Sequence, residues 1–199
     1  MERVVLKAPK ANPSFIGSWI IDPISLCDDL INHFERNVSR QRMGITSGGQ
    51  NLNIKDRLDI SIHPKQLNEP GNEVFGIYMS SLFLCYKDYL TQWSTLRGIG
   101  ERLEVGMFNL GRYNPGQHFQ GIHSERSGLD TLHRVLAWMT YLNDVEDGGE
   151  TYFINYDLNI RPQKGLTIIW PADWTHAHKG NIVLDGSKYM ITGWMNFPE

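Results

Sequence analysis

The chain has 199 residues, of which 41% are hydrophobic and 21% charged, and its formal net charge is −3. This composition is typical of a folded globular protein, and the length favours one domain over 1–199. It has no long Lys/Arg run, which argues against nucleic acid as a partner. Its charged start is unlike a signal peptide, and no apolar stretch approaches the ~20 residues that span a bilayer, which argues against a membrane. We expect a cytoplasmic protein acting on a peptide or small molecule; the oligomeric state is left open.

Two helices are expected in the first half, within a supporting region over 15–97. Asp22-Pro23 indicates an N-cap with proline at the first helical position, and apolar residues recur at helical spacing to near Asn37. Residues 39–71 are rich in Gly, Asn, Ser and charge, which predicts a long loop broken only by the alternating run Leu58–Ile62. A second helix is expected after Pro70-Gly71, with one apolar stripe: Val74, Tyr78, Leu82, Phe83, Tyr86, Tyr89, Leu90 and Trp93.

The second half changes to short β-type runs separated by Gly, Asn, Asp and Pro. About eight strands are predicted, at 103–110, 118–125, 134–142, 151–155, 158–160, 165–170, 178–184 and 188–197. Helices followed by eight short strands indicate an α+β fold, in which the strands form two facing sheets or a jelly roll. Cys27 and Cys85 lie in apolar patterns and are expected to be buried free thiols without a functional role.

A His-x-Glu triplet stands at the end of one predicted strand. Residues i and i+2 of a strand point to the same face, so His123 and Glu125 can both point into the sandwich. Iron(II) in oxygenases is commonly held by two histidines and one carboxylate on a single face. His176 and His178 are both candidates for the second histidine.

A lysine on the last predicted strand suggests what binds beside the metal. Lys188 is ten residues beyond His178, on what should be the adjoining strand, and Thr192 and Trp194 follow it at even spacings on the same face. A lysine that points inward needs an anionic partner to offset its loss of hydration. A dicarboxylate such as 2-oxoglutarate would supply that partner.

Several motifs in the second half fall in the order found in one enzyme family. They are Tyr113-Asn114-Pro115-Gly116, His123-x-Glu125, Arg134, the run Tyr-Leu-Asn-Asp-Val-Glu-Asp-Gly-Gly-Glu-Thr from Tyr141 to Thr151, Pro162-x-Lys164-Gly165, and His178 followed by Gly186-x-Lys188-Tyr189. This pattern resembles the catalytic domain of prolyl 4-hydroxylases over 103–197, and more weakly over 15–37. The resemblance implies a double-stranded β-helix as the catalytic β-core over 103–197, buttressed by the N-terminal helices.

The resemblance also implies roles for individual residues. His123, Glu125 and His178 would bind iron(II), because the family places its second histidine ten residues before the lysine, which favours His178 over His176. Lys188 would pair with the distal carboxylate of 2-oxoglutarate, where Tyr113 and Thr151 would add hydrogen bonds, and Trp194 would wall the cosubstrate pocket. One departure stands out: the family's usual carboxylate ligand is Asp, and Glu125 is one methylene longer.

The resulting hypothesis is a dioxygenase that uses iron(II), 2-oxoglutarate and O₂, with ascorbate as a further candidate, and releases succinate and CO₂ while hydroxylating a C–H bond. Peptidyl proline is the favoured substrate, and a free amino acid or another small metabolite is the alternative. From another class, a non-catalytic β-sandwich could bind a ligand while its histidines are structural or hold zinc. The stretches 47–51 and 127–130 are candidate lids over the site.

Overall fold

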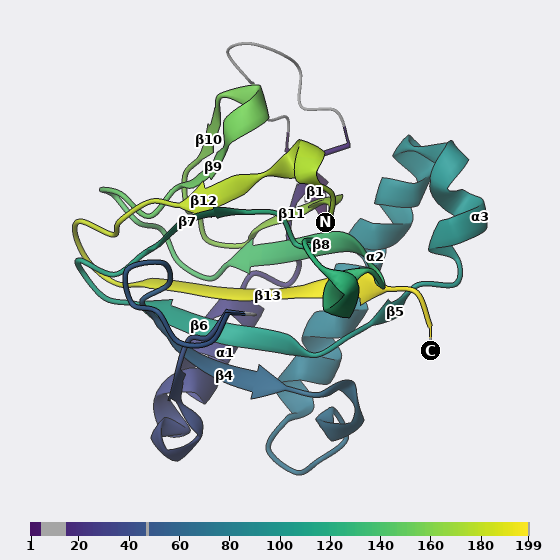
Figure 1. Ribbon diagram of the computed structural model, residues 1–199. Coiled ribbons are helices and arrows are strands. Elements are labelled where there is room, and N and C mark those ends of the chain that lie inside the picture. Colours follow the sequence, from purple (N-terminus) through teal and green to yellow (C-terminus); the bar gives the residue numbers. More distant parts are fainter. Residues whose placement is uncertain (5–14, 47, 199) are drawn as a thin grey trace.

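The computed structural model describes residues 1–4, 15–46 and 48–198. In this part of the chain thirteen strands form two antiparallel sheets that face each other (Figure 1). The larger sheet has the order β1-β2-β11-β8-β13-β6-β4-β3, with β5 also paired to β13, and the smaller sheet has the order β10-β9-β12-β7. The expected mixture of helices and two facing antiparallel sheets is confirmed.

The bounds of the strands agree with most of the predicted runs. The larger sheet comprises β1 (Glu2–Arg3), β2 (Gly17–Ile20), β3 (Arg42–Met43), β4 (Leu58–Ile62), β5 (Glu104–Val105), β6 (Phe108–Tyr113), β8 (Arg134–Tyr141), β11 (Leu166–Pro171) and β13 (Lys188–Asn196). The smaller sheet comprises β7 (Phe119–His123), β9 (Thr151–Phe153), β10 (Leu158–Ile160) and β12 (His178–Gly180). Each predicted run contains a strand, although the first divides into β5 and β6 and the seventh is reduced to the three residues of β12.

The segment that was expected to be mainly helical also supplies strands to the larger sheet. β2 pairs with β11, and the alternating run Leu58–Ile62 is β4, which pairs with β6 along its whole length. In β4 the alternation places Leu58, Ile60 and Ile62 on one face, so Arg57 and Asp59 lie on the other. That other face is the inner one, which becomes important at the site.

The main helices are α1 (Leu26–Arg36) and α2 (Glu73–Gln92), and the short α3 (Arg97–Gly100) follows α2. Brief 3₁₀ turns are η1 (Val38–Arg40), η2 (Pro64–Gln66), η3 (Ser94–Leu96), η4 (Leu129–Thr131), η5 (Ile154–Tyr156) and η6 (Trp174–His176). The predicted start of the first helix at Asp22 is wrong, because residues 22–25 form a turn and Ser25 is the N-cap, whereas its end at Asn37 is confirmed. Phe83 does not belong to the buried stripe of α2, since its side chain is 51% exposed.

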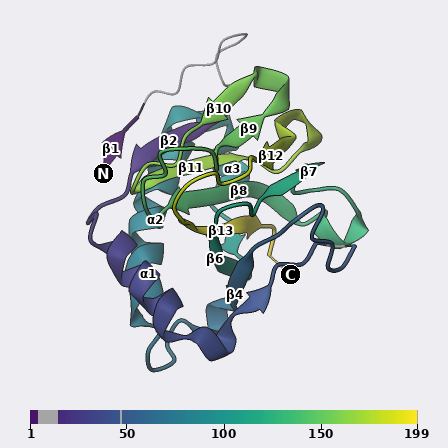
Figure 2. The same cartoon turned by 90° about the vertical axis from the view of Figure 1, so that its left-hand side faces the viewer.

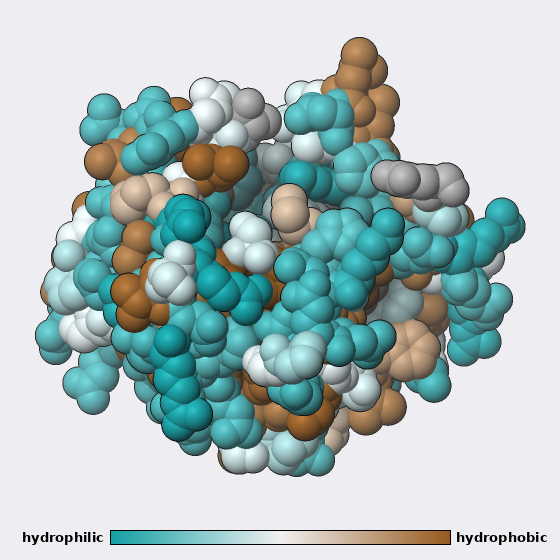
Figure 3. Space-filling view, turned by 90° about the horizontal axis from the view of Figure 1, so that it is seen from below, coloured by the Kyte–Doolittle hydropathy of each residue, from teal (hydrophilic) through white to brown (hydrophobic). Residues whose placement is uncertain are grey.

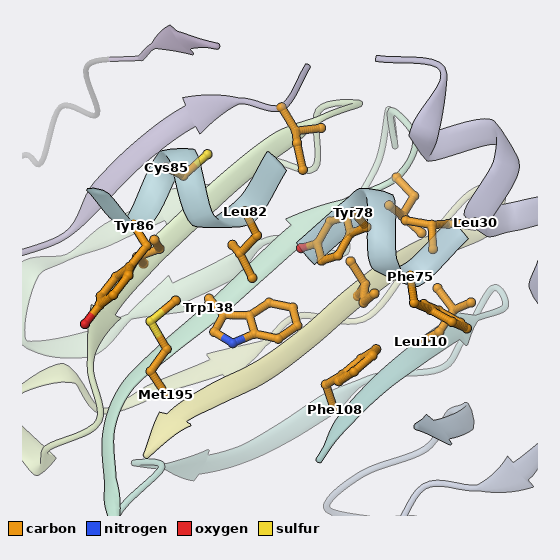
Figure 4. Close-up of a cluster of buried hydrophobic side chains, with 14 of the residues drawn as sticks. Leu30, Phe75, Tyr78, Leu82, Cys85, Tyr86, Phe108, Leu110, Trp138 and Met195 are labelled. Atoms are coloured by element: carbon orange, nitrogen blue, oxygen red, sulfur yellow. The ribbon is translucent and has the colours of Figure 1, made fainter. Parts of the chain in front are cut away.

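Helix α2 covers the outer face of the larger sheet with aromatic and aliphatic side chains (Figure 4). Tyr78 packs on Trp138 with ring centroids 5.9 Å apart, and its hydroxyl lies 2.8 Å from Oγ1 of Thr140 on β8. Phe75 meets Phe108 edge-on at 5.6 Å. Burying a large apolar side chain contributes about 1.5 to 3 kcal/mol, so this layer holds the helices against the sheet.

A second apolar cluster lies between the two sheets, and α1 and α2 lie together on the other side of the larger sheet (Figure 2). It includes Tyr113, Met139, Tyr141, Phe153 and Trp170.

The expected free thiols are confirmed, since Cys27 and Cys85 are both buried and unpaired. Seen from below, the surface is largely hydrophilic, with hydrophobic side chains in separate patches (Figure 3). None of the helices in the described residues is both long and apolar enough to cross a bilayer.

Candidate metal centre and anion pocket

Three potential metal ligands meet on the smaller sheet. His123 is the last residue of β7, His178 is the first of β12, and the two are direct partners in the antiparallel pairing. Glu125 follows β7 by two residues and turns its side chain back toward them. One ligand atom from each of the three lies within 4.8 Å of the others. This is the spacing that two histidines and a carboxylate need to bind one ion from a single side.

Both imidazoles are oriented by backbone carbonyls. Nδ1 of His123 lies 2.8 Å from the carbonyl oxygen of Gly121, and Nδ1 of His178 lies 3.0 Å from that of His176. When Nδ1–H donates to these carbonyls, Nε2 carries the free lone pair, which is the usual arrangement in metal-binding histidines. The two Nε2 atoms lie 3.8 Å and 3.3 Å from Oε1 of Glu125, so all three donors point to one place. The donor set therefore fits iron(II).

The carboxylate of Glu125 is held by an indole. Nε1 of Trp194 donates to its Oε2 at 2.7 Å, and the guanidinium of Arg134 lies 3.8 Å from the Trp194 ring while donating to the Glu125 backbone carbonyl. The longer side chain is thus accommodated, since it has a fixed partner as well as access to both histidines. Trp194 contacts the metal end of the site; its expected role in walling the cosubstrate pocket stays a prediction.

The protonation states at neutral pH suit a metal ligand set. Burial and the neighbouring His178 lower the pKa of His123 to about 4. Burial acts to raise the pKa of Glu125, but its interactions with His178, His123 and the Trp194 indole bring it down to about 2. His123 is therefore neutral and Glu125 ionised at pH 7, as metal binding requires.

Lys188 forms the other end of the site. It begins β13 directly opposite Tyr113 on β6, is 3% exposed, and donates from Nζ to the carbonyl oxygen of Gly149 at 2.6 Å. Its Nζ lies 5.0 Å and 5.2 Å from the ring centroids of Tyr113 and Tyr141. Within 1–4, 15–46 and 48–198 no carboxylate pairs with it. Burial and then the charge of Arg57 lower the pKa of Lys188 to about 7. A buried lysine of this kind needs an anionic partner to offset its loss of hydration.

The strand of Lys188 is not the neighbour of the His178 strand, so that expectation is wrong. β12 belongs to the smaller sheet and β13 to the larger one, because the chain crosses between the facing sheets after Gly180. The inward direction of Lys188 is nevertheless confirmed. Thr151 lies on the smaller sheet as well, at the start of β9, and its Oγ1 accepts a hydrogen bond from the Tyr141 hydroxyl at 2.6 Å.

Of the two candidate histidines, only His178 joins the cluster of three ligand atoms. His176 is buried in η6, where its Nε2 lies 3.3 Å from the hydroxyl of Tyr156. The candidate lid at 47–51 includes Ser47, which lies outside the described residues, and the candidate at 127–130 overlaps η4. Closure of either stretch stays a prediction.

The sequence interpretation missed a buried charged cluster beside Tyr113. Arg57, Asp59 and Lys55 are all buried on the inner side of the segment that leads into β4. The sequence does contain a signal for this cluster, because Leu58, Ile60 and Ile62 alternate with Arg57 and Asp59. A strand with one apolar face turns the intervening residues to its other face. Lys55 and Arg57 fall in the loop predicted over 39–71, because the segment around them is rich in Gly and Asn.

The comparisons with known proteins agree with this site. The sequence model described as the 2OG-Fe(II) oxygenase superfamily matches residues 108–196. Human prolyl 4-hydroxylase subunit alpha-1 is 28% identical in an alignment of 108 residues that covers 48% of this chain and 20% of that protein. The chain therefore spans only about a fifth of that relative's length.

Solved structures show the same fold over nearly the whole chain. A viral collagen prolyl hydroxylase from Paramecium bursaria Chlorella virus-1, in a 2-oxoglutarate complex, has a TM-score of 0.67 at 18% identity, covering 93% of this chain and 97% of that one. A Trichoplax adhaerens prolyl hydroxylase in complex with a hypoxia inducible factor peptide fragment has a TM-score of 0.72 at 15% identity, with 94% and 85% covered. The double-stranded β-helix is confirmed.

The matched family and the three clustered ligands together define the class. Residues 108–196 match the 2OG-Fe(II) oxygenase superfamily, and the chain resembles the prolyl 4-hydroxylases in sequence, fold and ligand set. Iron(II) and 2-oxoglutarate are the cofactor and cosubstrate that this family and the ligand set imply.

Proposed function

We propose that this chain hydroxylates peptidyl proline, using 2-oxoglutarate and O₂ at an iron(II) held by His123, Glu125 and His178. The observation that supports the oxygenase chemistry best is the pairing of a three-ligand cluster with a buried lysine that lacks an anionic partner in the described residues. A non-catalytic ligand-binding sandwich has no need for an iron-type triad together with such a lysine. An oxygenase needs it for the far end of a dicarboxylate.

Different residues act at the distal carboxylate of the cosubstrate and at the metal. Lys188 neutralises the distal carboxylate with charge-assisted hydrogen bonds, and Tyr113 and Thr151 donate their hydroxyl hydrogens to the same group. Trp194 keeps the carboxylate of Glu125 turned toward the two histidines. Bound iron(II) supplies the activation of O₂ that couples hydroxylation to the release of succinate and CO₂. The apolar side chains between the sheets keep water away from this chemistry.

The proposal of peptidyl proline is supported by the proteins that this chain resembles. Human prolyl 4-hydroxylase subunit alpha-1 and the two solved structures described above are all prolyl hydroxylases, and one of those structures contains a peptide fragment. A free amino acid is the competing substrate class, and the same assay distinguishes the two.

The test combines binding with turnover. Under anaerobic conditions the iron(II)-loaded chain should bind 2-oxoglutarate, and Lys188→Ala should weaken that binding by about 2 to 5 kcal/mol while leaving iron affinity nearly unchanged. Lys87→Ala, on the exposed face of α2, is the matched control. With O₂, succinate release should rise with proline-rich peptides, with or without ascorbate. Release that responds only to free amino acids would reassign the substrate, and no binding of 2-oxoglutarate by the parent would reject the enzyme class.

A further inference from the structure

We propose that Arg57 is a positioning residue for 2-oxoglutarate, acting through the hydroxyl group of Tyr113. This inference rests on the proposed function, because it requires 2-oxoglutarate to occupy the pocket beside Lys188. Arg57 immediately precedes β4, and its side chain is buried on the inner side of the larger sheet. Its Nη1 donates a hydrogen bond of 2.9 Å to the Tyr113 oxygen.

The guanidinium is held from behind by a carboxylate. Nε of Arg57 lies 2.7 Å from Oδ1 of Asp59, and Nζ of Lys55 lies 3.1 Å from Oδ2 of the same group. Burial acts to lower the pKa of Arg57, but Asp59 and the contact with Tyr113 raise it overall, so the guanidinium stays charged. Removing Asp59 would therefore leave two buried cations without their shared counter-ion.

Two glycines leave the room that this cluster occupies. A Cβ atom at Gly111 on β6 would come within 2.7 Å of Oδ1 of Asp59, and one at Gly44 would come within 2.8 Å of Cε of Lys55. Both separations are shorter than side chains tolerate. The cluster is thus enclosed by backbone on two sides, which restricts how far the Arg57 guanidinium can move from Tyr113.

The direction of the Arg57 bond determines what Tyr113 can do. A guanidinium can only donate, so the Tyr113 oxygen must be the acceptor, and its own hydrogen is left for a different partner. In the described residues no acceptor for that hydrogen is present, although the side chain is 4% exposed. A buried hydroxyl hydrogen without a partner is costly. An anion in the pocket would satisfy it.

Neighbouring groups show the same polarity. Thr151 accepts from Tyr141, so its hydroxyl hydrogen is likewise directed elsewhere, and Lys188 uses one of its three donors on Gly149. The ring of Tyr113 has the Arg57 guanidinium 5.4 Å and the Lys188 ammonium 5.0 Å from its centroid. Lys188, Tyr113 and Thr151 can therefore all donate to an anion bound between them, and Arg57 ensures that Tyr113 belongs to these donors.

A double-mutant cycle tests whether Arg57 acts through Tyr113. The dissociation constant of 2-oxoglutarate would be measured by calorimetry on the anaerobic, iron(II)-loaded full chain for the parent, Arg57→Gln, Tyr113→Phe and the double variant. We expect Arg57→Gln to weaken 2-oxoglutarate binding on the order of tenfold. In the Tyr113→Phe background the same change should add little, because the hydroxyl that it orients is gone. The KM for 2-oxoglutarate should rise while kcat at saturating cosubstrate is kept.

The matched control is Arg112→Gln. Arg112 is the neighbour of Tyr113 on β6 and is also ion-paired to a carboxylate, with Nη1 2.8 Å from Oε1 of Glu35, but it lies on the opposite face of the sheet. It should leave 2-oxoglutarate binding unchanged. Iron(II) affinity, titrated in parallel, should be the same in every variant, which a general loss of structure would not produce.

Equal 2-oxoglutarate affinity in Arg57→Gln and the parent would overturn the inference, and so would the same factor in both Tyr113 backgrounds. If Arg57→Gln does not fold, Arg57→Met, which keeps the bulk of the side chain and leaves Asp59 paired with Lys55, takes its place in the cycle, and the same two outcomes decide. A parent that binds no 2-oxoglutarate rejects the proposed function together with the inference. A parent that binds it, with an Arg57 variant that binds equally well, rejects the inference alone.

Discussion

The metal end and the anion end of the site are built on different sheets, and their surroundings differ accordingly. His123 lies on β7, the edge strand of the smaller sheet, and is only half-buried, whereas Lys188 lies on β13, inside the larger sheet, and is buried with Tyr113 and Arg57. An edge strand can be approached from outside, while an interior strand is covered on both sides. We therefore expect substrate to reach the metal from the edge of the smaller sheet, with the cosubstrate anchored in the interior.

The largest effect is expected at the metal end, from Glu125. Glu125→Ala should abolish tight iron(II) binding, because two imidazoles alone hold the ion weakly. Glu125→Asp should retain iron but reduce 2-oxoglutarate turnover on the order of a hundredfold. The shorter side chain withdraws the carboxylate by about a bond length and takes it out of hydrogen-bond reach of Trp194. Iron stoichiometry and succinate release check the order parent, Asp, Ala. Full iron and activity in Glu125→Ala would remove this residue from the ligand set.

Substitutions of His178 and His176 distinguish a metal ligand from a residue that only supports one. His178→Ala should lose iron(II) and turnover. His176→Ala should keep measurable iron affinity, because its contribution to His178 is a backbone carbonyl that survives the substitution. Metal titration of both variants checks this, with thermal unfolding as the control for the buried His176. Loss of iron in His176→Ala alone would reverse the assignment.

At the anion end the expected signature is a pH dependence. Burial and the charge of Arg57 lower the pKa of Lys188 to about 7, so above pH 7 binding of the dianion must also take up a proton. The affinity for 2-oxoglutarate should then fall by up to about tenfold per pH unit above 7 and level off below it. Lys188→Arg, which stays charged, should flatten the profile. Calorimetry between pH 6 and 9 measures both; a flat profile in the parent would show that Lys188 is not the counter-ion.

The smallest effect is expected for Trp194, which holds the carboxylate of Glu125. Trp194→Phe removes the 2.7 Å bond to Glu125 but keeps a ring beside Arg134. Iron(II) affinity should fall about tenfold, which is typical for groups that orient a metal ligand. Since that bond also helps to lower the pKa of Glu125, acid release of iron should begin at a higher pH. Trp174→Phe, at an indole that is 74% exposed, is the control and should change neither property.

Local spacing accounts for the parts of the site that were predicted from the sequence. His123 and Glu125 share a face because strand residues alternate, and Lys188 could be assigned an inward direction because Thr192 and Trp194 follow it at even spacings. The helix α2 and all eight C-terminal strand runs were found for the same reason, since their periodicity is carried by neighbouring residues.

The remaining features of the fold and the site depend on pairing between strands that are far apart in the sequence. β2 becomes a strand only because β11 lies beside it, and Arg57 is buried only because β4 joins the edge of β6, so neither outcome is encoded in a short window of sequence. The separation of His178 and Lys188 onto facing sheets likewise depends on where the chain crosses after β12. The sequence by itself determined which chemical groups enter the site. Only the tertiary structure decided which of them meet, because hydrogen bonds such as that between Arg57 and Tyr113 join residues that lie far apart along the chain.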